Sequence, residues 1–341
     1  MKKIKKKDYY LTIAYTTYNR KKFILNQLRS LININLPDNI EIIVIDNFSN
    51  DGTFVAVSNL IKHSRIKIYH NNKNIGFAGN FVEAFKRAKG KYIMWASDKD
   101  GINFNDSNRL FKWMDNKKTD VVMLNYFKKD IKKYESTSVR KNKTRLINYD
   151  DLLFCSHLPG TIWNRKKTLL CLKDWHILEK KYPETTKYYP NLLLLIKLMP
   201  FSNSYFFNGH LSYQREKKEK GMSFATAVSG EHYSHLASRW LQHKEFINLI
   251  ESQIKKTRNL KHKNYLCKMQ KFLNENLYEL FSRAILEEKP NLHRHFSNVF
   301  SPFFIIKRGY KFLKTVFKSF LDNPMFTIYR IKARLKLKYK I

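Results

Sequence analysis

Residues 40–53 read IEIIVIDNFSNDGT and carry the pattern that decides the fold. An unbroken apolar run rich in β-branched residues ends in a polar, glycine-containing turn that begins at Asp46. Such a run is typical of a strand buried on both faces, as in parallel sheets. Asn50 or Asp51 can cap a helix that runs on to about residue 63. The stretch therefore predicts a strand, a polar turn and a helix, which is one unit of an alternating α/β fold.

The same alternation recurs on both sides of this stretch. Apolar patterning predicts further strands at 9–16, 65–69, 91–96 and 120–125, and helices at 20–34, 77–89 and about 107–114, with Gly90 closing the second of these helices. Strands that alternate with helices of this length favour a parallel, doubly wound sheet, in which ligands bind beyond the carboxyl ends of the strands. No GxGxxG follows the first strand and no GxxxxGK[ST] occurs, which disfavours a dinucleotide fold and excludes a P-loop.

The composition and the distribution of charge indicate which kind of partner the protein binds. The 341 residues include 65 Lys and Arg against 28 Asp and Glu, for a formal net charge of +37 at pH 7. The excess is concentrated in 1–8, 128–146 and 301–341, which indicates an anionic surface as partner. Residues 303–321 place apolar and basic side chains on opposite faces of a helix, a pattern typical of membrane interfaces, or of a helix packed on the protein's own core.

Two further features indicate where the protein works. The three cysteines are scattered and form no CxxC pair, which favours a reducing compartment. No apolar run approaches the roughly 20 residues that cross a bilayer. We therefore expect a cytoplasmic protein that is peripheral on the inner face of the cell membrane, held there by its basic tail at 301–341.

Four polar turns at the predicted strand ends resemble, in order, the motifs of family 2 glycosyltransferases with the GT-A fold. The resemblance covers roughly residues 9–127. Its elements are Thr17-Tyr18-Asn19-Arg20 for P-T-Y-N-R, with Thr16 in place of the proline, Asp46 to Thr53 for V-D-(D/N)-x-S-x-D-x-T, Asn74-Ile75-Gly76 with Asn80 for N-x-G…N, and Asp98-Lys99-Asp100 for D-x-D. The resemblance extends more weakly to bacterial enzymes of surface-polysaccharide and O-antigen synthesis.

The resemblance implies a division of the chain. Residues 1–230 would form the GT-A domain, a Rossmann-like and mostly parallel sheet flanked by helices, with a donor half at 9–127 and an acceptor half at 128–230. Apolar stripes at 231–256 and 262–287 predict a helical hairpin within 231–300, and 301–341 would be the membrane-associating tail.

The resemblance also implies a donor site for a nucleotide-sugar, by default a UDP-sugar. Its residues would be Thr17, Tyr18, Asn19, Arg20, Asp46, Asn47, Asn74, Gly76, Asn80, Ser97 and Asp98. Asp98 would lie near the ribose and a divalent cation, and Asp100 would be the main metal ligand. Hard carboxylate oxygens at one strand end select Mn²⁺ or Mg²⁺, and strand alternation would turn Lys99 away from that ion. Alternatively, Asp46 and Asn47 cap a helix, and Asn74 and Asn80 are ordinary loop residues.

In the acceptor half, residues 128–230, the resemblance to the family is weaker and the candidate catalytic residues are harder to assign. Residues 156–165 resemble the family's acceptor-side strand and loop. An inverting transfer needs a carboxylate that deprotonates the acceptor hydroxyl, and the family's acidic pair is replaced here by a segment around Tyr189-Pro190-Asn191. Glu184 and Asp174 are the candidate bases. Arg215, in the basic segment 202–230, could close over the diphosphate and assist the leaving group, or belong to a solvated loop.

These features predict an inverting glycosyltransferase that moves a single sugar to a lipid-linked or membrane-held glycan. One alternative is a catalytically inactive relative that serves as a glycan-binding or scaffold subunit. A nucleic-acid-binding protein is less favoured, because no RRM, KH, OB or helix-turn-helix signature accompanies the charge, so we expect no specific nucleic-acid partner. The sequence does not predict the oligomeric state.

Overall fold

A computed structural model describes residues 9–33, 36–62, 64–98, 100–124, 127–128, 144–149, 151, 160–209, 211–214 and 236–275. Its main sheet has eight strands in the order β3-β2-β1-β4-β9-β6-β10-β8. They are β1 Leu11–Thr17, β2 Ile40–Asp46, β3 Ile66–His70, β4 Tyr92–Ala96, β6 Val121–Leu124, β8 Arg145–Leu146, β9 Thr161–Asn164 and β10 Ser204–Phe207. A small second sheet orders β5 (Asp100–Ile102), β11 (Ser212–Gln214) and β7 (Phe127–Lys128).

The amino-terminal half follows the predicted alternation of strands and helices. β1 pairs in parallel with β2 and β4, and β2 pairs in parallel with β3. The strands alternate with α1 (Lys21–Ile32), α2 (Thr53–Ile61) and α3 (Gly76–Arg87), and α4 (Ser107–Lys117) precedes β6. β9 runs antiparallel between β4 and β6. The mostly parallel α/β sheet predicted from the sequence is confirmed.

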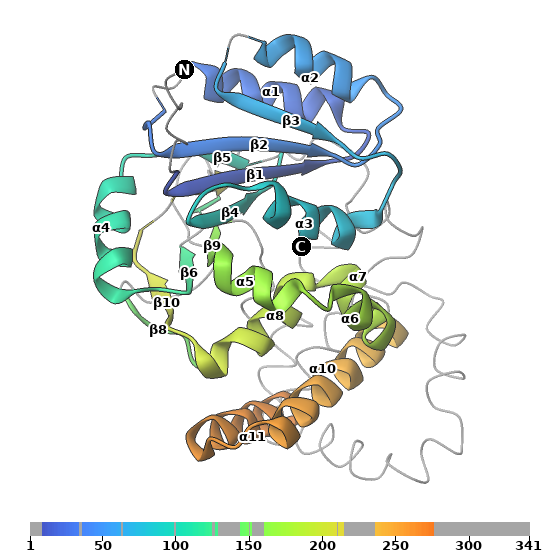
Figure 1. Cartoon of the computed structure of the whole chain (residues 1–341), viewed down its shortest axis with the longest axis vertical. Helices are drawn as coiled ribbons and strands as arrows, with labels where there is room; N and C mark the ends of the chain where they lie inside the picture. The colour runs from blue at the N-terminus through green and yellow to red at the C-terminus, as the bar shows by residue number, and fades with distance from the viewer. Residues whose placement is uncertain are drawn as a thin grey trace, which may run out of the picture.

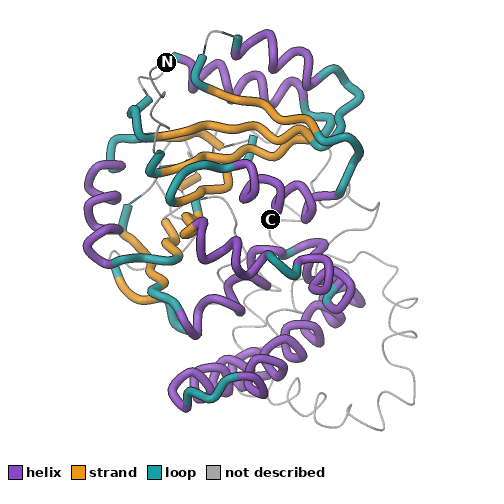
Figure 2. Tube along the Cα trace, viewed as in Figure 1, coloured by secondary structure: helices purple, strands orange, loops and turns teal. Residues whose placement is uncertain are grey.

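Helices cover both faces of the sheet, as Figures 1 and 2 show. One apolar core joins the sheet to α1, α2 and α4 through residues such as Leu28, Val57 and Phe111. The other joins it to α3 and the helices of the carboxyl-terminal half, through residues such as Phe81 and Trp163. Those helices are α5 Arg165–Leu172, α6 Trp175–Lys181, α7 Pro183–Tyr188, α8 Pro190–Leu198, the short helix η2 Met199–Phe201, α10 Leu236–Lys256 and α11 Leu260–Glu275.

The two long helices α10 and α11 pack against each other, and α10 also packs on α7 and α8. Their apolar faces, which include Ile250, Leu266 and Met269, belong to the same core as α3. The carboxylate of Glu245 on α10 accepts hydrogen bonds from the backbone amides of Glu184 (3.1 Å) and Thr185 (2.6 Å) at the start of α7. The paired helices are therefore an integral layer of the fold. The predicted boundary at 230 and the tail at 301–341 lie outside the described residues.

None of the helices within the described ranges is both long enough and apolar enough to cross a bilayer.

Hydrogen bonds among a few buried polar residues join the amino ends of the central strands. The Thr12 hydroxyl donates to Glu41 (2.8 Å) and accepts from the Gly90 amide (2.8 Å), and Glu41 also accepts from the Lys89 amide (3.0 Å). A β-carbon on Gly90 would lie 2.6 Å from the Thr12 nitrogen. Gly90 is thus needed for close backbone approach. The prediction that it closes the preceding helix was wrong, because α3 ends at Arg87.

Candidate active site

The polar turns at the carboxyl ends of β1, β2 and β4 meet at one edge of the sheet. Asn19, with φ at +51°, donates its backbone amide to the Ser49 hydroxyl at 2.8 Å, and its side-chain oxygen accepts from the Asn50 amide at 2.9 Å. These reciprocal contacts join the turn after β1 to the turn after β2. The parallel register of the strands, with Thr17 opposite Asp46, places the two turns side by side.

Arg20 joins the turn after β1 to the turn after β4. Its Nε and Nη2 both bind the Asp98 carboxylate, the latter at 3.0 Å, so that both carboxylate oxygens are engaged. The Asp98 side chain is only 6% exposed. The guanidinium also lies 4.2 Å from the ring centroid of Phe23. A paired, bidentate geometry of this kind holds both groups in fixed orientations.

Asp46 lies beneath the turn after β2 and is fully buried. Its carboxylate accepts from the Ser49 hydroxyl and backbone amide, and lies 2.7 Å from Nδ1 of His70. Through these contacts Asp46 stabilises the turn after β2. Its expected contact with the nucleotide base stays a prediction.

A network of asparagine side chains braces the same edge of the sheet. The Asn47 amide donates to the Asn74 side chain at 2.8 Å, while its oxygen accepts from Asn71 at 3.1 Å. Asn71 donates in turn to Asn80 (3.0 Å), whose amide donates to the carbonyl of Ile45 (3.1 Å). The network ties β2 to the segment before α3 and to α3 itself. Asn80 thus lies on α3 and not in a loop, whereas Asn74 lies in the loop before α3 and is joined to Asn47.

Gly76 begins α3 beside this network. Its backbone amide donates to Asn74 at 2.9 Å, and its carbonyl accepts from Asn47 at 3.2 Å. Its φ of +73° is a conformation that side chains other than glycine's rarely adopt. The N-x-G element therefore forms a turn whose shape is fixed by the backbone conformation and the hydrogen bonds of Gly76.

Three residues at this edge were missed by the sequence reasoning. Asn71 joins the asparagine network, and His70, which ends β3 directly opposite Asp46, pairs with that carboxylate. Phe48 has φ at +66°, is 49% exposed, and places its ring centroid 5.7 Å from that of His70. Two sequence signals could have identified them. One is a histidine at a strand end in register with a buried aspartate, and the other is an aromatic residue within a polar turn.

The remaining predicted donor residues occupy the same turns. The Thr17 hydroxyl is buried at the end of β1 and has no hydrogen-bond partner within the described chain. Tyr18 is half-buried in the next turn, and Ser97 is half-buried ahead of Asp98. They therefore lie at the edge where they were expected, but at different depths.

The two acids of D-x-D lie on different elements. Asp98 is in the turn after β4, whereas Asp100 opens β5 and pairs with Gln214 across the small sheet. The argument that strand alternation orients Lys99 therefore does not apply, and Lys99 lies outside the described residues. In the part of the chain that the structure describes, no three His, Cys, Asp or Glu side chains are grouped so as to hold a metal. Because Arg20 engages both oxygens of Asp98, that carboxylate fits a metal poorly, which leaves Asp100 as the candidate ligand.

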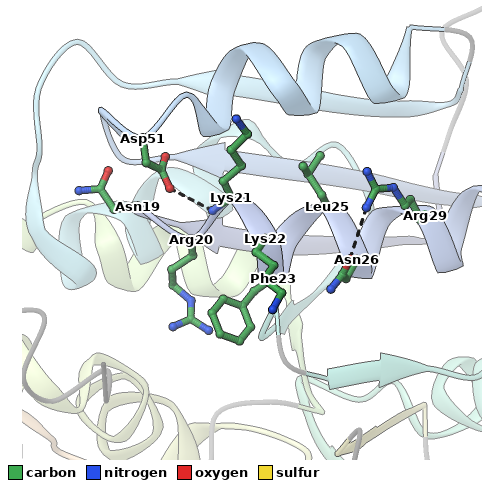
Figure 3. Close-up of a pocket in the computed structure, with 9 residues that line it drawn as sticks. All are labelled: Asn19, Arg20, Lys21, Lys22, Phe23, Leu25, Asn26, Arg29 and Asp51. Carbon is green, nitrogen blue, oxygen red and sulfur yellow. Dashed lines mark hydrogen bonds between the residues drawn. The ribbon is translucent and has the colours of Figure 1, made fainter. Parts of the chain in front are cut away.

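A basic groove of about 510 Å³ opens beside these turns. Figure 3 shows that it follows the start of α1, and its lining includes Arg20, Lys21, Lys22 and Arg29. One carboxylate, Asp51, also lines it and accepts from the Lys21 amide at 3.1 Å. Partial burial opposes the shift, but hydrogen bonds from Thr53 and from the backbone lower the pKa of Asp51. The groove thus offers a cationic surface to an anionic ligand.

The structure separates the two candidate bases. Glu184 lies in the first turn of α7, which packs on α3. Asp174 precedes α6 and lines a different groove, whose described lining includes none of the strand-end residues. Arg215 lies outside the described residues.

Known proteins share both the sequence pattern and the fold. Residues 12–171 match the sequence profile of glycosyl transferase family 2. Residues 1–349 of TarS from S. aureus, solved with UDP-GlcNAc, align at 18% identity over 90% of this chain and 81% of theirs, with a TM-score of 0.61. The complex of the same protein with UDP aligns at 19% identity over 82% and 76%, with a TM-score of 0.58.

A more remote structural relative comes from an archaeon. The mannosyltransferase PcManGT of Pyrobaculum calidifontis, solved with GDP-Man and Mn²⁺, aligns at 14% identity over 98% of this chain and 88% of its own, with a TM-score of 0.50. No curated protein matches the sequence. The family profile thus matches a little under half of the chain, and the solved structures share its mostly parallel α/β fold of GT-A type, so this chain is similar in both sequence pattern and fold to glycosyltransferases of family 2.

Proposed function

We propose that this enzyme transfers a single sugar from a UDP-sugar to a lipid-linked or membrane-held glycan, with inversion at the anomeric carbon. The observation that carries the proposal is the Arg20–Asp98 pair, which joins two of the motif-bearing turns beside the basic groove on α1. TarS, which has been solved with UDP and with UDP-GlcNAc, supports uridine as the base.

The donor would lie across the joined turns. Its diphosphate is a dianion or more at neutral pH and would be attracted to the cationic side chains around Arg20 and Lys21. Two aromatic residues, the half-buried Tyr18 and the exposed Phe48, flank the turns and could stack on the base. The asparagine network beneath them would keep this surface rigid, which lowers the ordering cost of binding.

We propose a divalent cation, Mn²⁺ or Mg²⁺, with Asp100 as its protein ligand. One or two carboxylates together with phosphate oxygens are a common way to hold Mg²⁺ in nucleotide enzymes. Such an ion, when bound, would neutralise charge on the leaving diphosphate. In this arrangement Asp98 contributes by fixing Arg20. The Mn²⁺ in the PcManGT structure supports a metal in this fold.

For the general base we propose Glu184 over Asp174. Glu184 lies at the start of α7, and Glu245 fixes the backbone there through two hydrogen bonds. Because α7 packs on α3, which begins at Gly76 in the donor site, Glu184 lies on an element that is connected to that site. Arg215 as an aid to the leaving group, and 301–341 as an anchor on anionic membrane, remain parts of this proposal.

A ligand panel followed by turnover tests the proposal. UDP-, GDP-, CDP- and dTDP-sugars are compared by thermal shift with and without Mn²⁺, because a ligand of the native state raises its apparent stability. We expect the UDP-sugars to give the largest shift and a slow release of UDP without acceptor. Asp100→Asn should abolish the Mn²⁺-dependent part, whereas Asp115→Asn, an exposed acid on α4, should not.

Specific outcomes would contradict each part. Binding of UDP-sugars without any release of UDP, with or without membrane extracts as acceptor, would favour the inactive glycan-binding relative. Equal turnover by Asp100→Asn and the unsubstituted enzyme would remove the metal assignment. Loss of turnover in Asp174→Asn, with Glu184→Gln unaffected, would reverse the choice of base.

A further inference from the structure

A second groove, of about 620 Å³, lies between α6, α8 and α10, away from the strand-end turns. It is closed at one end by residues 257–259, which connect α10 to α11. Figure 1 shows these helices together in the half of the molecule opposite β3 and α2. The described lining contains none of the residues assigned to the donor site. The groove is therefore separate from the proposed donor site, although Asp174, the less favoured candidate base, lies in its lining.

The charge of this groove is strongly unbalanced. Four cations line it, Lys181, Lys197, Lys256 and Arg258, against the single carboxylate of Asp174. They come from α6, α8, the end of α10 and the following connection, so three separate parts of the chain bring positive charge to one concave surface. Like charges gathered in this way repel one another, and an anion would relieve that repulsion.

Lys197 is the most enclosed of these cations. Its ammonium group donates to the backbone carbonyl of Cys171 at 3.0 Å, which fixes it at the wall of the groove. Burial lowers the pKa of Lys197; the nearby Cys171 and Asp174 oppose this shift, and Lys256 adds to it. The charged lysine thus lacks full compensation from its surroundings.

Gln253 adds an acceptor to the same wall. Its amide nitrogen donates to the carbonyl of Ile196 at 3.2 Å, while its buried oxygen has no partner within the described residues. A buried acceptor without a donor costs stability. Gln253 thus lines the groove with one polar atom whose hydrogen-bonding capacity is unused within the described residues.

We propose that the groove between α6, α8 and α10 binds a phosphate group, carried by a soluble molecule or by a lipid headgroup. Arg258 supplies the planar donors that match phosphate oxygens in pairs, and the lysines supply point charges. The proposal rests on the concave shape of the groove and on the four cations that converge on it. It is independent of the assignment of the donor.

The chain offers a matched pair of double variants. Lys181→Gln with Lys256→Gln removes two cations of the groove, while Lys180→Gln with Lys255→Gln removes two cations at the neighbouring positions, which do not line it. All four side chains are exposed, so both variants should fold, as melting curves will verify. Their net charges are equal, which cancels the general attraction of a chain at +37 to any anionic surface.

Hydrogen exchange of peptides 174–182 and 252–259 reports on the groove itself. The probes are inorganic phosphate against chloride at equal ionic strength, and phosphatidylglycerol vesicles against phosphatidylcholine vesicles. We expect protection of both peptides in the unsubstituted protein and in Lys180→Gln/Lys255→Gln. In Lys181→Gln/Lys256→Gln the apparent affinity should fall about ten-fold or more, as expected for lost charged hydrogen bonds.

The arms of the experiment identify the source of the phosphate. Protection by inorganic phosphate alone supports a soluble ligand, and protection by vesicles alone supports a lipid headgroup. The proposal is overturned if neither probe protects the two peptides, or if the two double variants lose protection equally.

Discussion

Arg20 and Asp98 form a bidentate ion pair between the turn after β1 and the turn after β4. The two residues are 78 positions apart in the chain, and both belong to motifs that mark the family. Because both Asp98 oxygens bind the guanidinium, the first acid of D-x-D stabilises the shape of the site. The second acid, Asp100, opens β5 on the small sheet. The two acids therefore lie on different elements of the fold.

Arg20→Lys should reduce both donor turnover and folding stability. Lysine keeps the charge but cannot make two parallel bonds to a carboxylate, so Asp98 should lose its fixed orientation. We expect kcat/KM to fall at least about ten-fold, with a loss of about 1–3 kcal/mol in the free energy of unfolding. Steady-state kinetics and urea melts measure the two effects. Arg29→Lys, an exposed change on the same helix, should alter neither, and equal effects of both variants would refute a special role for the pair.

Asn80→Ala should destabilise the donor edge of the sheet. It removes one of the two acceptors of the Asn71 amide and the side-chain donor to the carbonyl of Ile45, and both of these groups are buried. We expect a loss of about 2–3 kcal/mol in the free energy of unfolding, together with weaker donor binding. Chemical denaturation and donor titration are the measurements. Asn108→Ala, at an exposed site on α4, is the control, and a stability change as small as the control's would contradict the network.

The sequence predicted those parts of the fold in which periodicity is strong. The run at β2 and the alternation of β1 to β4 with α1 to α3 could be read directly, because β1 and β2 are buried on both faces and the helices between the strands have regular apolar spacing. The antiparallel insertion of β9 between β4 and β6 could not, because pairing partners are set by tertiary packing and leave no local pattern. Gly90 was misread for the same reason, since its close approach to Thr12 depends on a strand far away in the chain.

The sequence predicted which motifs form the candidate site, but it did not predict which hydrogen bonds join their side chains. The positions of the asparagines could be read, whereas the chain of bonds through Asn71 depends on the spacing between two loops. The resemblance implies that Asp46 meets the nucleotide base, and this stays a prediction. The structure adds that Asp46 is enclosed by Ser49 and by His70, which pairs with it from the neighbouring strand. Such burial is a property of the assembled turn.

Phe48→Ala should raise the KM for the donor with little change in kcat. The exposed ring projects from the turn after β2 beside His70, where a nucleotide base could stack on it. Stacking on an aromatic ring contributes about 1–3 kcal/mol, so KM should rise about five-fold or more. Phe48→Tyr preserves the ring and should restore the KM. A fall in kcat at unchanged KM, or a failure of tyrosine to restore binding, would be inconsistent with stacking.

Glu245→Gln should loosen the contact between α10 and α7. The carboxylate accepts from two amides at the start of α7, and a glutamine has only one side-chain oxygen to offer, with its amide group facing a donor. We expect a loss of about 1–3 kcal/mol in the free energy of unfolding and faster hydrogen exchange at 183–188. Glu179→Gln, an exposed change on α6, should have neither effect. Unchanged exchange at 183–188 would show that the contact does not hold α7.

His243 should make the protein less stable as the pH falls below 6.5. Burial between the paired helices lowers the pKa of His243 to about 4, although its hydrogen bond with Asn274 opposes this shift. Above pH 6.5 neither the native nor the unfolded chain carries the proton, so the contribution to stability is complete. Between pH 6.5 and 4 the unfolded chain takes up a proton that the native state does not, and the free energy of unfolding falls by about 3 kcal/mol in all. His243→Gln should flatten this part of the pH profile in urea melts, while His176→Gln, at an exposed position, should leave it as it is. If the profile keeps its slope in His243→Gln, a group other than this histidine sets the acid limit of the fold.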